Sequence, residues 1–420
     1  MSDNIKQQML TIGQQAKQAY QVLAIADTEL KNKGLITAAQ LIRDNQADII
    51  AANKLDMQFG RDKGLTPALL DRLELNQQRI EAIAKGLEDV AQLPDPVNKI
   101  LASWDRPNGL KISRVTVPLG VIGVIYESRP NVTADAAGLC LKSGNAVILR
   151  GGSESFNSST ALVKTMHDAL NQVGLPTACI QLVPTRDRAA VGEMLTMVDY
   201  IDIIVPRGGK GLTERVQEQS KIPTIQHLDG NCHTYIHASA DVEKAVSVVY
   251  NAKMRRTGIC GATESLVVDK TIAPIILPKL LDKLSDVDCV AKGEQEAIDI
   301  DNRIQQVNED DWGTEYLDKV ISIKLCDSLN QAVTHVNKYS SGHTEAIIAE
   351  DKNAAVEFIR QVDSAIVMHN TSTQFADGGE FGMGAEIGIS TGRLHARGPV
   401  GVDQLVTYKY AVYGDGQVRN

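Results

Sequence analysis

Short apolar strands that alternate with helical segments constrain the fold of this chain more than any other feature of its sequence. The first four strands are expected at Val121–Tyr126, Ala146–Leu149, Ile180–Val183 and Ile201–Val205, where β-branched and aliphatic residues form nearly continuous runs. Between the second and third of these runs, apolar residues recur at the spacing of a helix. This alternation predicts parallel strands joined by crossover helices, and such sheets bind ligands beyond the carboxyl ends of their strands.

A second α/β set is expected after residue 233. Its strands are predicted at Ser265–Val268, Ile321–Leu325, Ala346–Ala349 and Ala365–Met368. Helical stretches between them are predicted at Ala273–Leu284, Leu329–Asn337 and Asn353–Val362. The sequence therefore predicts an α/β protein with two domains, each built on a sheet of the parallel type.

Two further regions complete the expected architecture. Residues 1–100 show helical periodicity, with Thr66 as an N-cap and Pro67 as the first residue of one helix. A Pro-Asn-Gly turn within Asp105–Gly109 joins two extended segments, and Gln404–Val412 alternates like an edge strand. The hairpin has two interpretations, a simple surface hairpin or an arm that pairs with another subunit.

The charge balance argues against one broad class of function. The chain of 420 residues has 43 Lys and Arg against 52 Asp and Glu, and its net charge of −9 disfavours a nucleic-acid-binding surface. Its six cysteines lie far apart without a CxxC pair, which is typical of reduced thiols. The polar start lacks a secretory signal, and the apolar runs are too short to span a membrane. We therefore expect a cytoplasmic protein that binds neither nucleic acid nor membrane.

Two glycine-rich loops each follow a predicted strand and precede a helix. They are Arg150–Ser153 and Pro206–Gly211. Backbone N–H groups and a helix N-terminus at such loops favour phosphate, although neither loop is a P-loop and no dinucleotide fingerprint is present. Either loop alone could equally be a tight turn, but together they predict a cofactor that carries phosphate. Arg150 and Arg207 favour NADP, because an extra ribose phosphate needs a cation.

Cys260 is the candidate nucleophile because its surroundings differ from those of the other cysteines. Gly258 and Gly261 leave room for a substrate carbonyl, and three cations, Lys253, Arg255 and Arg256, precede it. Positive charge lowers the pKa of a thiol and raises its thiolate fraction. The alternative is a cysteine that packs as a small hydrophobic residue. The histidines show no metal-ligand spacing, so no metal site is expected.

Several segments resemble known protein families. Pro118–Ile125 and Lys142–Arg150 resemble the cofactor domain of the aldehyde dehydrogenase superfamily, and Arg256–Cys260 is similar to its nucleophile segment. Three longer motifs resemble the gamma-glutamyl phosphate reductase family within that superfamily, namely Tyr126–Thr133, Ser341–Ile347 and Gly379–Gly388. The resemblance covers nearly the whole chain. It implies an aldehyde-dehydrogenase-like fold in which residues 1–100 and 119–232 form a Rossmann-like cofactor domain, 233–395 a catalytic domain, and 101–118 with 400–415 an oligomerisation arm.

The resemblance also implies a reaction, the reduction of L-glutamyl 5-phosphate by NADPH to glutamate 5-semialdehyde and phosphate in proline biosynthesis. Cys260 would expel phosphate and form a thioester, and hydride from the nicotinamide would give a thiohemiacetal that collapses to the aldehyde. The backbone N–H of Cys260 and the side chain of Asn131 are the candidate donors to the oxyanion. A homo-oligomer and a transient contact with glutamate 5-kinase are the protein partners that the resemblance suggests.

Some binding residues follow from the same resemblance, and others are candidates from the sequence itself. Glu315 would hold the nicotinamide ribose, Arg150 and Ser153 fall near the adenosine ribose, and Arg207, Gly208 and Gly209 are further cofactor candidates. For the substrate, Arg129, Arg255 and Arg256 are candidates for its anionic groups, and Glu127 or Glu386 for its ammonium. Each of these substrate candidates could equally be a surface or packing residue.

One departure from the superfamily pattern bears on the reaction. Oxidising aldehyde dehydrogenases carry a general-base glutamate in a Glu-Leu-Gly-Gly pattern, where this chain has His227-Leu228-Asp229-Gly230. Because that base activates the water that hydrolyses the thioester, its loss favours a reductive enzyme. His227 itself is expected to be structural, although its role stays open. The alternatives are a reductase for acyl-CoA, an oxidising aldehyde dehydrogenase, and a non-catalytic nucleotide-binding or scaffold protein.

Overall fold

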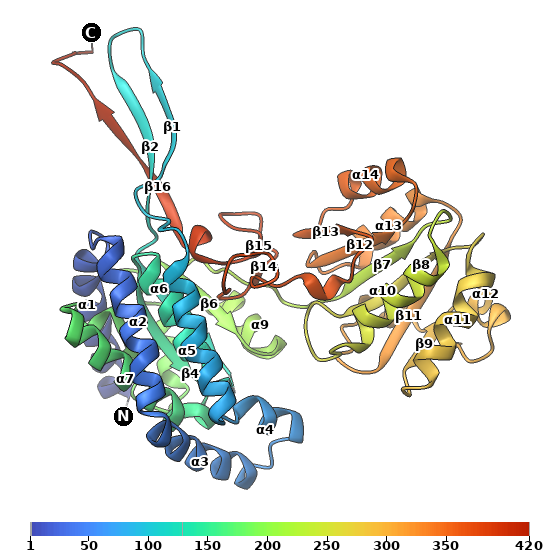
Figure 1. The fold of residues 1–420 in the computed structure, drawn as a ribbon, viewed down its shortest axis with the longest axis horizontal. Coiled ribbons are helices and arrows are strands. Elements are labelled where there is room, and N and C mark those ends of the chain that lie inside the picture. The colour runs from blue at the N-terminus through green and yellow to red at the C-terminus, as the bar shows by residue number, and fades with distance from the viewer. Residues whose placement is uncertain (1, 128, 420) are drawn as a thin grey trace. The chain divides into compact units, whose positions relative to one another are not determined.

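The computed structural model describes residues 2–127 and 129–419, and the chain forms two compact units (Figure 1). Unit 1 comprises Met1–Gln226, Gly382–Gly388 and Val400–Asn420, and unit 2 comprises His227–Phe381 and Ile389–Pro399. Each unit contains its own parallel sheet, so the predicted α/β class is confirmed. In the part of the chain that the structure describes, no helix combines the length and the apolar composition needed to cross a membrane.

A run of helices opens unit 1, as the periodicity of residues 1–100 predicts. These helices are α1 (Ser2–Leu23), α2 (Thr28–Asp44), α3 (Gln46–Asp62), α4 (Pro67–Leu73) and α5 (Gln77–Gln92). The predicted cap of α4 is confirmed, since the Leu69 N–H donates to the Thr66 hydroxyl at 3.4 Å. The buried carboxylate of Asp56 in α3 accepts hydrogen bonds from the backbone N–H groups of Asn157 and Ser158, which ties this helix to the rest of unit 1.

The sheet of unit 1 has the strand order β5-β4-β3-β6, and all of its strands are parallel. The strands are β3 (Val121–Tyr126), β4 (Ala146–Gly151), β5 (Ile180–Leu182) and β6 (Ile203–Arg207). The helices between and after them are α6 (Asn131–Lys142), η1 (Ser153–Ser155), α7 (Phe156–Val173), η2 (Thr177–Cys179), α8 (Ala189–Met194) and α9 (Lys210–Gln219). Met9 and Ile12 of α1 pack on Val121 and Ile148, so helices cover the sheet and its strands read as continuous apolar runs.

The sheet of unit 2 has the order β10-β9-β11-β8-β7-β12-β13 and is also parallel. Its strands are β7 (Cys232–Ile236), β8 (Thr263–Asp269), β9 (Val290–Gly293), β10 (Gln305–Gln306), β11 (Val320–Cys326), β12 (Thr344–Ile348) and β13 (Ile366–His369). The four strands predicted from sequence are confirmed as β8, β11, β12 and β13. Sequence reasoning missed β7, because Cys, His and Thr interrupt its apolar pattern although all five of its residues are buried.

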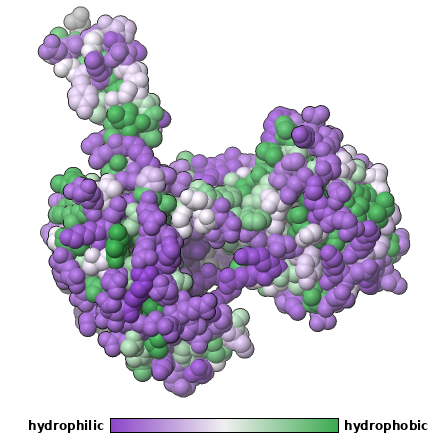
Figure 2. Space-filling view, in the orientation of Figure 1, coloured by the Kyte–Doolittle hydropathy of each residue, from purple (hydrophilic) through white to green (hydrophobic). Residues whose placement is uncertain are grey.

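Helices cover both faces of the sheet of unit 2. They are α10 (Val242–Met254), α11 (Ala273–Ser285), α12 (Gln295–Ile300), α13 (Leu329–Tyr339) and α14 (Lys352–Gln361), with the short elements η3 (Glu309–Gly313), η4 (Thr373–Phe375), β14 (Ile389–Ser390) and β15 (Gly398–Pro399). The apolar residues of α10, α11 and α12 share one core with Leu266 and Ile321. Those of α13 and α14 share another with Tyr235 and Val267 on the opposite side. Hydrophilic residues dominate the visible surface of each unit, and apolar residues occur there in small patches (Figure 2).

A three-stranded antiparallel sheet extends from unit 1 (Figure 1). It consists of β1 (Ile100–Asp105), β2 (Lys111–Pro118) and β16 (Val406–Tyr413) in the order β1-β2-β16, and η5 (Val402–Gln404) precedes β16. Gly109 in the connecting turn has φ +88°, a conformation that favours glycine. Cross-strand pairing places Trp104, Ile112 and Val412 side by side, and Trp104 and Val412 are exposed.

The segment Gly382–Gly388 belongs to unit 1, whereas the domain prediction places it with the second domain. Two hydrogen bonds hold it there, from Ile387 N–H to the Val400 carbonyl at 2.9 Å and from Val400 N–H to the Gly388 carbonyl at 2.8 Å. A Cβ atom on Gly388 would lie 3.1 Å from Cδ of Arg207, so glycine allows the close approach to β6.

A fully buried ion pair joins α10 to β8 in unit 2. The Lys253 ammonium donates to the Glu264 carboxylate, and both side chains are completely excluded from solvent. Glu264 also accepts a hydrogen bond from the Leu317 N–H at 3.2 Å. Burial raises the pKa of Glu264 to about 7, although Lys253 opposes this shift. Each charged group has lost its hydration on burial, and the attraction to the other group offsets that loss.

We expect Lys253→Met to destabilise the protein by about 3–5 kcal/mol, because it leaves the Glu264 carboxylate buried without its cation. The double variant Lys253→Met/Glu264→Leu should recover most of that loss. Urea unfolding gives the free energies. The control is Lys244→Met on the same helix, whose exposed pair with Glu350 should contribute less than about 1 kcal/mol. Equal losses for Lys253→Met and Lys244→Met would contradict the prediction.

Candidate active site

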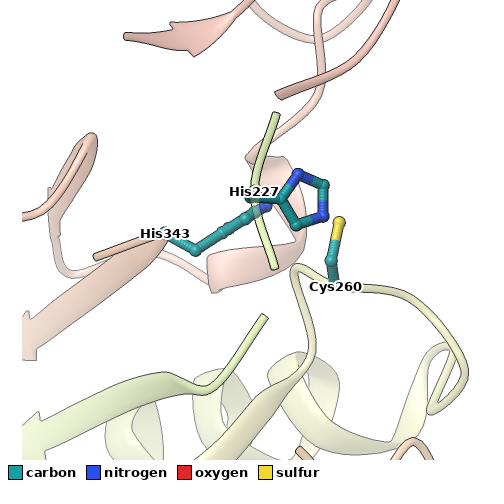
Figure 3. A group of neighbouring side chains, drawn as sticks. All are labelled: His227, Cys260 and His343. Atoms are coloured by element: carbon teal, nitrogen blue, oxygen red, sulfur yellow. The ribbon is translucent and has the colours of Figure 1, made fainter. Parts of the chain in front are cut away.

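Cys260 lies in the loop between α10 and β8, at the amino-terminal edge of the sheet of unit 2. His227 precedes β7 and His343 immediately precedes β12, and both strands neighbour one another in the same parallel sheet. Parallel strands bring their amino ends to one edge. As a result the three side chains point toward one another (Figure 3), and one nitrogen of each ring and the Cys260 sulfur lie within 4.8 Å of one another.

The orientation of His227 is set by a backbone carbonyl. Its Nδ1 lies 2.8 Å from the Ile389 carbonyl oxygen, which can only accept, so Nδ1 carries a proton. Nε2 is then the nitrogen available to interact with the Cys260 sulfur. The rings of His227 and His343 meet edge to face, with centroids 4.9 Å apart and planes at 76°. His227 is therefore part of the site, whereas the sequence predicts a structural role for it.

His343 is fully buried behind the sulfur. Its Nδ1 lies 2.9 Å from the Thr344 hydroxyl and 3.7 Å from the Cys232 sulfur. Its Nε2 is buried and has no hydrogen-bond partner among the atoms that the structure describes. Ring nitrogens of His233 and His335 are also buried without a partner, so it is the position of His343 beside the Cys260 sulfur that makes it part of the candidate site.

The two histidines determine the ionisation of the candidate nucleophile. Burial by itself raises the pKa of the Cys260 thiol, but the positive charge of His343 and a hydrogen bond with His227 outweigh it, and the pKa lies well below the ordinary thiol value. Burial instead raises the pKa of every other cysteine, that is Cys140, Cys179, Cys232, Cys289 and Cys326. Cys260 is thus the one thiol with thiolate character.

The cations that the sequence places upstream of Cys260 have other positions. Lys253 is the buried partner of Glu264. Arg255 and Arg256 are exposed, and Arg255 lies 3.4 Å from the Gln374 amide oxygen. The expectation that these three cations lower the pKa of the thiol is therefore wrong in its cause, because the histidines are the main source of the effect.

Gly230 and Glu315 also lie close to Cys260. A Cβ atom on Gly230 would lie 2.6 Å from Cβ of Cys260, so only glycine fits against the nucleophile. The Gly230 N–H donates to the Glu315 carboxylate, and burial raises the pKa of Glu315 despite this hydrogen bond. Glu315 is thus placed in the same unit as Cys260, close enough for their charges to interact.

The candidates for the adenosine end of a cofactor lie in unit 1. Arg150 is buried at the carboxyl end of β4 and donates to the carbonyls of Gly151 and Arg186, while its Nε has no partner among the described atoms. The Ser153 hydroxyl accepts a hydrogen bond from the Lys63 ammonium at 3.1 Å and donates to Glu154. Lys63 on the neighbouring helical cover had no signal in the sequence, because it is remote from the glycine loop along the chain.

The second predicted phosphate loop is occupied in part by a carboxylate. Gly208 and Gly209 join β6 to α9, and the Gly209 N–H donates to the Glu127 carboxylate at 3.4 Å. Glu127 therefore lies at the helix N-terminus where a phosphate is predicted. The Arg207 side chain lies against Gly388, and its charge acts on the buried carboxyl of Asp135, whose pKa burial raises to about 6.

The remaining candidates also lie in unit 1. Asn131 begins α6, and its amide donates to the Asp135 carboxylate at 2.9 Å. Arg129 and Glu386 are partly buried members of the same unit. The structure thus brings Cys260, Glu315, Arg255 and Arg256 into one unit and Asn131, Arg129, Glu127 and Glu386 into the other.

Comparison with known proteins agrees with this arrangement. A family model described as the aldehyde dehydrogenase family matches residues 2–311. The chain is 59% identical over 418 residues to a gamma-glutamyl phosphate reductase of Rhodospirillum rubrum, covering all of this chain and 98% of that protein. It is 54% identical over 420 residues to one of Brucella suis, covering both chains completely. A crystal structure of gamma-glutamyl phosphate reductase from Thermotoga maritima matches with a TM-score of 0.96 and 42% identity, over 98% of this chain and all of that one.

Alkylation by iodoacetamide should modify Cys260 selectively. Because its pKa is lowered, the thiolate is present at neutral pH, and the rate should fall only when the pH drops below that lowered value. His343→Gln removes the ring, so the pKa of Cys260 should rise, and the thiolate-dependent rise of the rate with pH should move to higher pH by the same amount. Mass spectrometry of the modified peptide gives the rates. Equal modification of the buried Cys140 would contradict the assignment.

Proposed function

The chain belongs to the aldehyde dehydrogenase family, and from this we propose that it reduces L-glutamyl 5-phosphate to L-glutamate 5-semialdehyde and phosphate with NADPH, a step of proline biosynthesis. The relatives that match over their full length carry the name of that activity. The observation that carries the proposal is a single low-pKa thiol held between two histidines, as an acyl-transfer nucleophile requires.

The first step uses the thiolate of Cys260 as nucleophile. Its sulfur attacks the acyl carbon, the carbon–sulfur bond forms, and the carbon–oxygen bond to phosphate breaks. The leaving phosphate needs a proton, and a protonated histidine beside the sulfur is placed to donate it. His227 suits this role, because its Nδ1 proton is committed to Ile389 and its Nε2 faces the Cys260 sulfur, where it would carry and release a second proton.

The second step converts the thioester to the aldehyde. Aldehyde dehydrogenase family members use NAD or NADP, and such a cofactor, held by the loops of unit 1 and by Glu315, would supply the hydride for the thioester carbon. The oxyanion that develops needs donors, for which we propose the Cys260 backbone N–H and the Asn131 amide. Asn131 would have to exchange its present hydrogen bond with Asp135. When the carbon–sulfur bond breaks, the two histidines stabilise the returning thiolate.

The loss of a carboxylate base supports the reductive direction. His227 stands where the oxidising members of the family carry their glutamate. Because His227 lies beside the sulfur, we assign it a role in the acyl-transfer step. It also replaces the carboxylate base that would activate a water molecule to hydrolyse the thioester. A carboxylate does approach the site, but Glu315 accepts a hydrogen bond from Gly230, which fits the proposed role of holding the nicotinamide ribose.

For the substrate we propose that Arg255 and Arg256 bind its anionic groups. Both are exposed, both lie in unit 2, and they are four and five residues from the nucleophile along the chain. Guanidinium groups match carboxylate and phosphate with paired hydrogen bonds. Arg129, Glu127 and Glu386 remain proposals for the amino-acid end. A transient contact with glutamate 5-kinase and a cytoplasmic location likewise stay predictions.

The residues of unit 1 fit an NADP-type ribose phosphate. Lys63 donates a hydrogen bond to the Ser153 hydroxyl, and Arg150 begins the same loop, so two cations lie at the Arg150–Ser153 loop. The Nε of Arg150 has no acceptor among the described atoms, so it could donate to a phosphate oxygen. Arg207, Gly208 and Gly209 form the second loop that we propose for the cofactor. Glu154 carries a negative charge in the first loop, but its pairing with Lys63 offsets it. We therefore propose NADPH rather than NADH as the reductant.

Lys63→Ala should raise KM for NADPH by about tenfold and leave KM for NADH nearly unchanged, because loss of one phosphate contact is worth about 1.4 kcal/mol. Steady-state kinetics with both cofactors measures the split. Lys54→Ala on α3, the helix that Lys63 caps, is the control, since its side chain is exposed and nine residues before Lys63. A parallel rise for both cofactors would remove Lys63 from the 2′-phosphate site.

Cys260→Ala should lower kcat by at least ~10⁴-fold and leave the affinity for NADPH nearly unchanged, because only the nucleophile is removed. In the reverse direction, NADP reduction by glutamate 5-semialdehyde should require inorganic phosphate, which resolves the thioester. Absorbance of the reduced nicotinamide measures both. A rate that is indifferent to phosphate would favour an oxidising enzyme, and a phosphate-independent rate that requires coenzyme A would favour an acyl-CoA reductase.

We also propose that the β1-β2-β16 sheet is an oligomerisation arm. Trp104, Tyr408, Tyr410 and Val412 are exposed apolar residues of this sheet, and Trp104 packs edge to face with Tyr410 at 6.1 Å. The strand β16 is an edge strand of this sheet. Exposed aromatic side chains on an edge strand are typical of a surface that another copy of the chain covers.

Tyr410→Asp/Val412→Asp should weaken self-association by about 100-fold, since two buried contacts of roughly 1.4 kcal/mol each would be lost. Sedimentation velocity over a range of concentrations gives the dissociation constants. Lys409→Ala on the same strand, whose side chain points to the other face of the sheet, is the control. A wild-type chain that stays monomeric at micromolar concentration would remove the arm proposal.

A further inference from the structure

The side chains around Cys260 have a chemical capacity beyond covalent catalysis. A thiolate and two imidazoles are the ligands that Zn²⁺ and related cations prefer. In the described part of the chain, one sulfur and one nitrogen from each of His227 and His343 lie within 4.8 Å of one another. All three residues belong to unit 2, so the arrangement depends on a single unit.

Both rings have the hydrogen bonds that a metal-binding histidine needs. The Nδ1 proton of His227 is committed to the Ile389 carbonyl at 2.8 Å, the arrangement that commonly orients a metal-bound imidazole and leaves Nε2 for the metal. His343 is held through Nδ1 by the Thr344 hydroxyl at 2.9 Å. Its Nε2 is buried, and no described atom satisfies it. Ring nitrogens of His233 and His335 are likewise buried without a partner, so the case for a cation rests on the three converging ligand atoms.

The geometry requires only a small adjustment to close around a cation. With a Zn–S bond of about 2.3 Å and a Zn–N bond of about 2.0 Å, tetrahedral ligands stand about 3.5 Å apart. The ligand atoms lie within 4.8 Å of one another, so their separations have to shrink by at most about 1.3 Å. Cys260 lies in a loop with glycines at 258 and 261, where backbone and side chain can move by that amount.

We propose that Cys260, His227 and His343 form a three-ligand site for a thiophilic divalent cation, Zn²⁺ in particular, and that its binding reversibly inactivates the protein. The cation neutralises the thiolate and occupies the sulfur lone pair that would attack an acyl carbon. A water completes the fourth position, as in zinc sites with three protein ligands. The ion is an inhibitor and not a resident cofactor, because the nucleophile must be free for acyl transfer. The inference concerns binding to the chain without substrate and so goes beyond the proposed function.

Cobalt binding to the full chain, in the absence of substrate and cofactor, tests the site directly. Co²⁺ should give a sulfur-to-metal charge-transfer absorption with the intense visible bands of a four-coordinate ion, and Zn²⁺ should displace it. Cys260→Ala should abolish the charge-transfer absorption, and His343→Gln should weaken Zn²⁺ binding by at least ~100-fold. His237→Asn is the matched control, because this histidine of unit 2 pairs with Ser239 and stands outside the group.

A second measurement needs no variant and so does not depend on how the substituted chains fold. Zn²⁺ should protect Cys260 from iodoacetamide in the wild-type chain, and a chelator should restore both alkylation and activity. Unchanged alkylation at saturating Zn²⁺, or a charge-transfer absorption that persists in Cys260→Ala, would overturn the proposal. The proposed reduction could fail while cobalt binding succeeds, so the two proposals are tested separately.

Discussion

The proposed chemistry of unit 2 depends on the interaction of two histidine rings, His227 and His343, with the sulfur of Cys260. Burial alone would keep Cys260 protonated, as it does for the other cysteines. The charge of His343 and the contact with His227 reverse that preference. Each ring is oriented in turn, His227 by the Ile389 carbonyl and His343 by Thr344. The proposed nucleophile and the proposed metal ligand are the same sulfur, so both proposals have one physical origin in its thiolate character.

A second layer of buried polar groups positions the residues around the sulfur. Gly230 lies directly against Cys260 and donates its N–H to Glu315. Leu317, two residues further on, has a positive φ of 53°, and its N–H is held by Glu264. Glu264 in turn is paired with Lys253 at the end of α10, the helix that leads to the nucleophile loop. Separating the two charges of a buried pair would leave each of them without water and without its partner, at a large cost in free energy. The pair therefore holds both segments in position.

Unit 1 uses the opposite edge of a parallel sheet. Its candidate cofactor loops follow the carboxyl ends of β4 and β6, the edge at which parallel sheets bind ligands. In unit 2 the candidate nucleophile and both histidines stand at the amino ends of strands. The helical cover adds Lys63 to the first loop, and Glu127 occupies the helix terminus at the second. The candidate cofactor residues and the candidate nucleophile thus belong to different units.

The sequence by itself determined the α/β class, most strands and the singular position of Cys260, because apolar periodicity and glycine placement are local properties of the chain. It could not reveal β7, whose polar residues are buried only by the neighbouring strands and helices. It assigned the lowered pKa to upstream cations, whereas Lys253 turned out to be neutralised by Glu264. Only the tertiary structure decided that His227 and His343, which are distant from Cys260 along the chain, lie beside its sulfur. The reason is that parallel strands align their amino ends at one edge, and pairing between β7 and β12 is a non-local property that no short segment encodes.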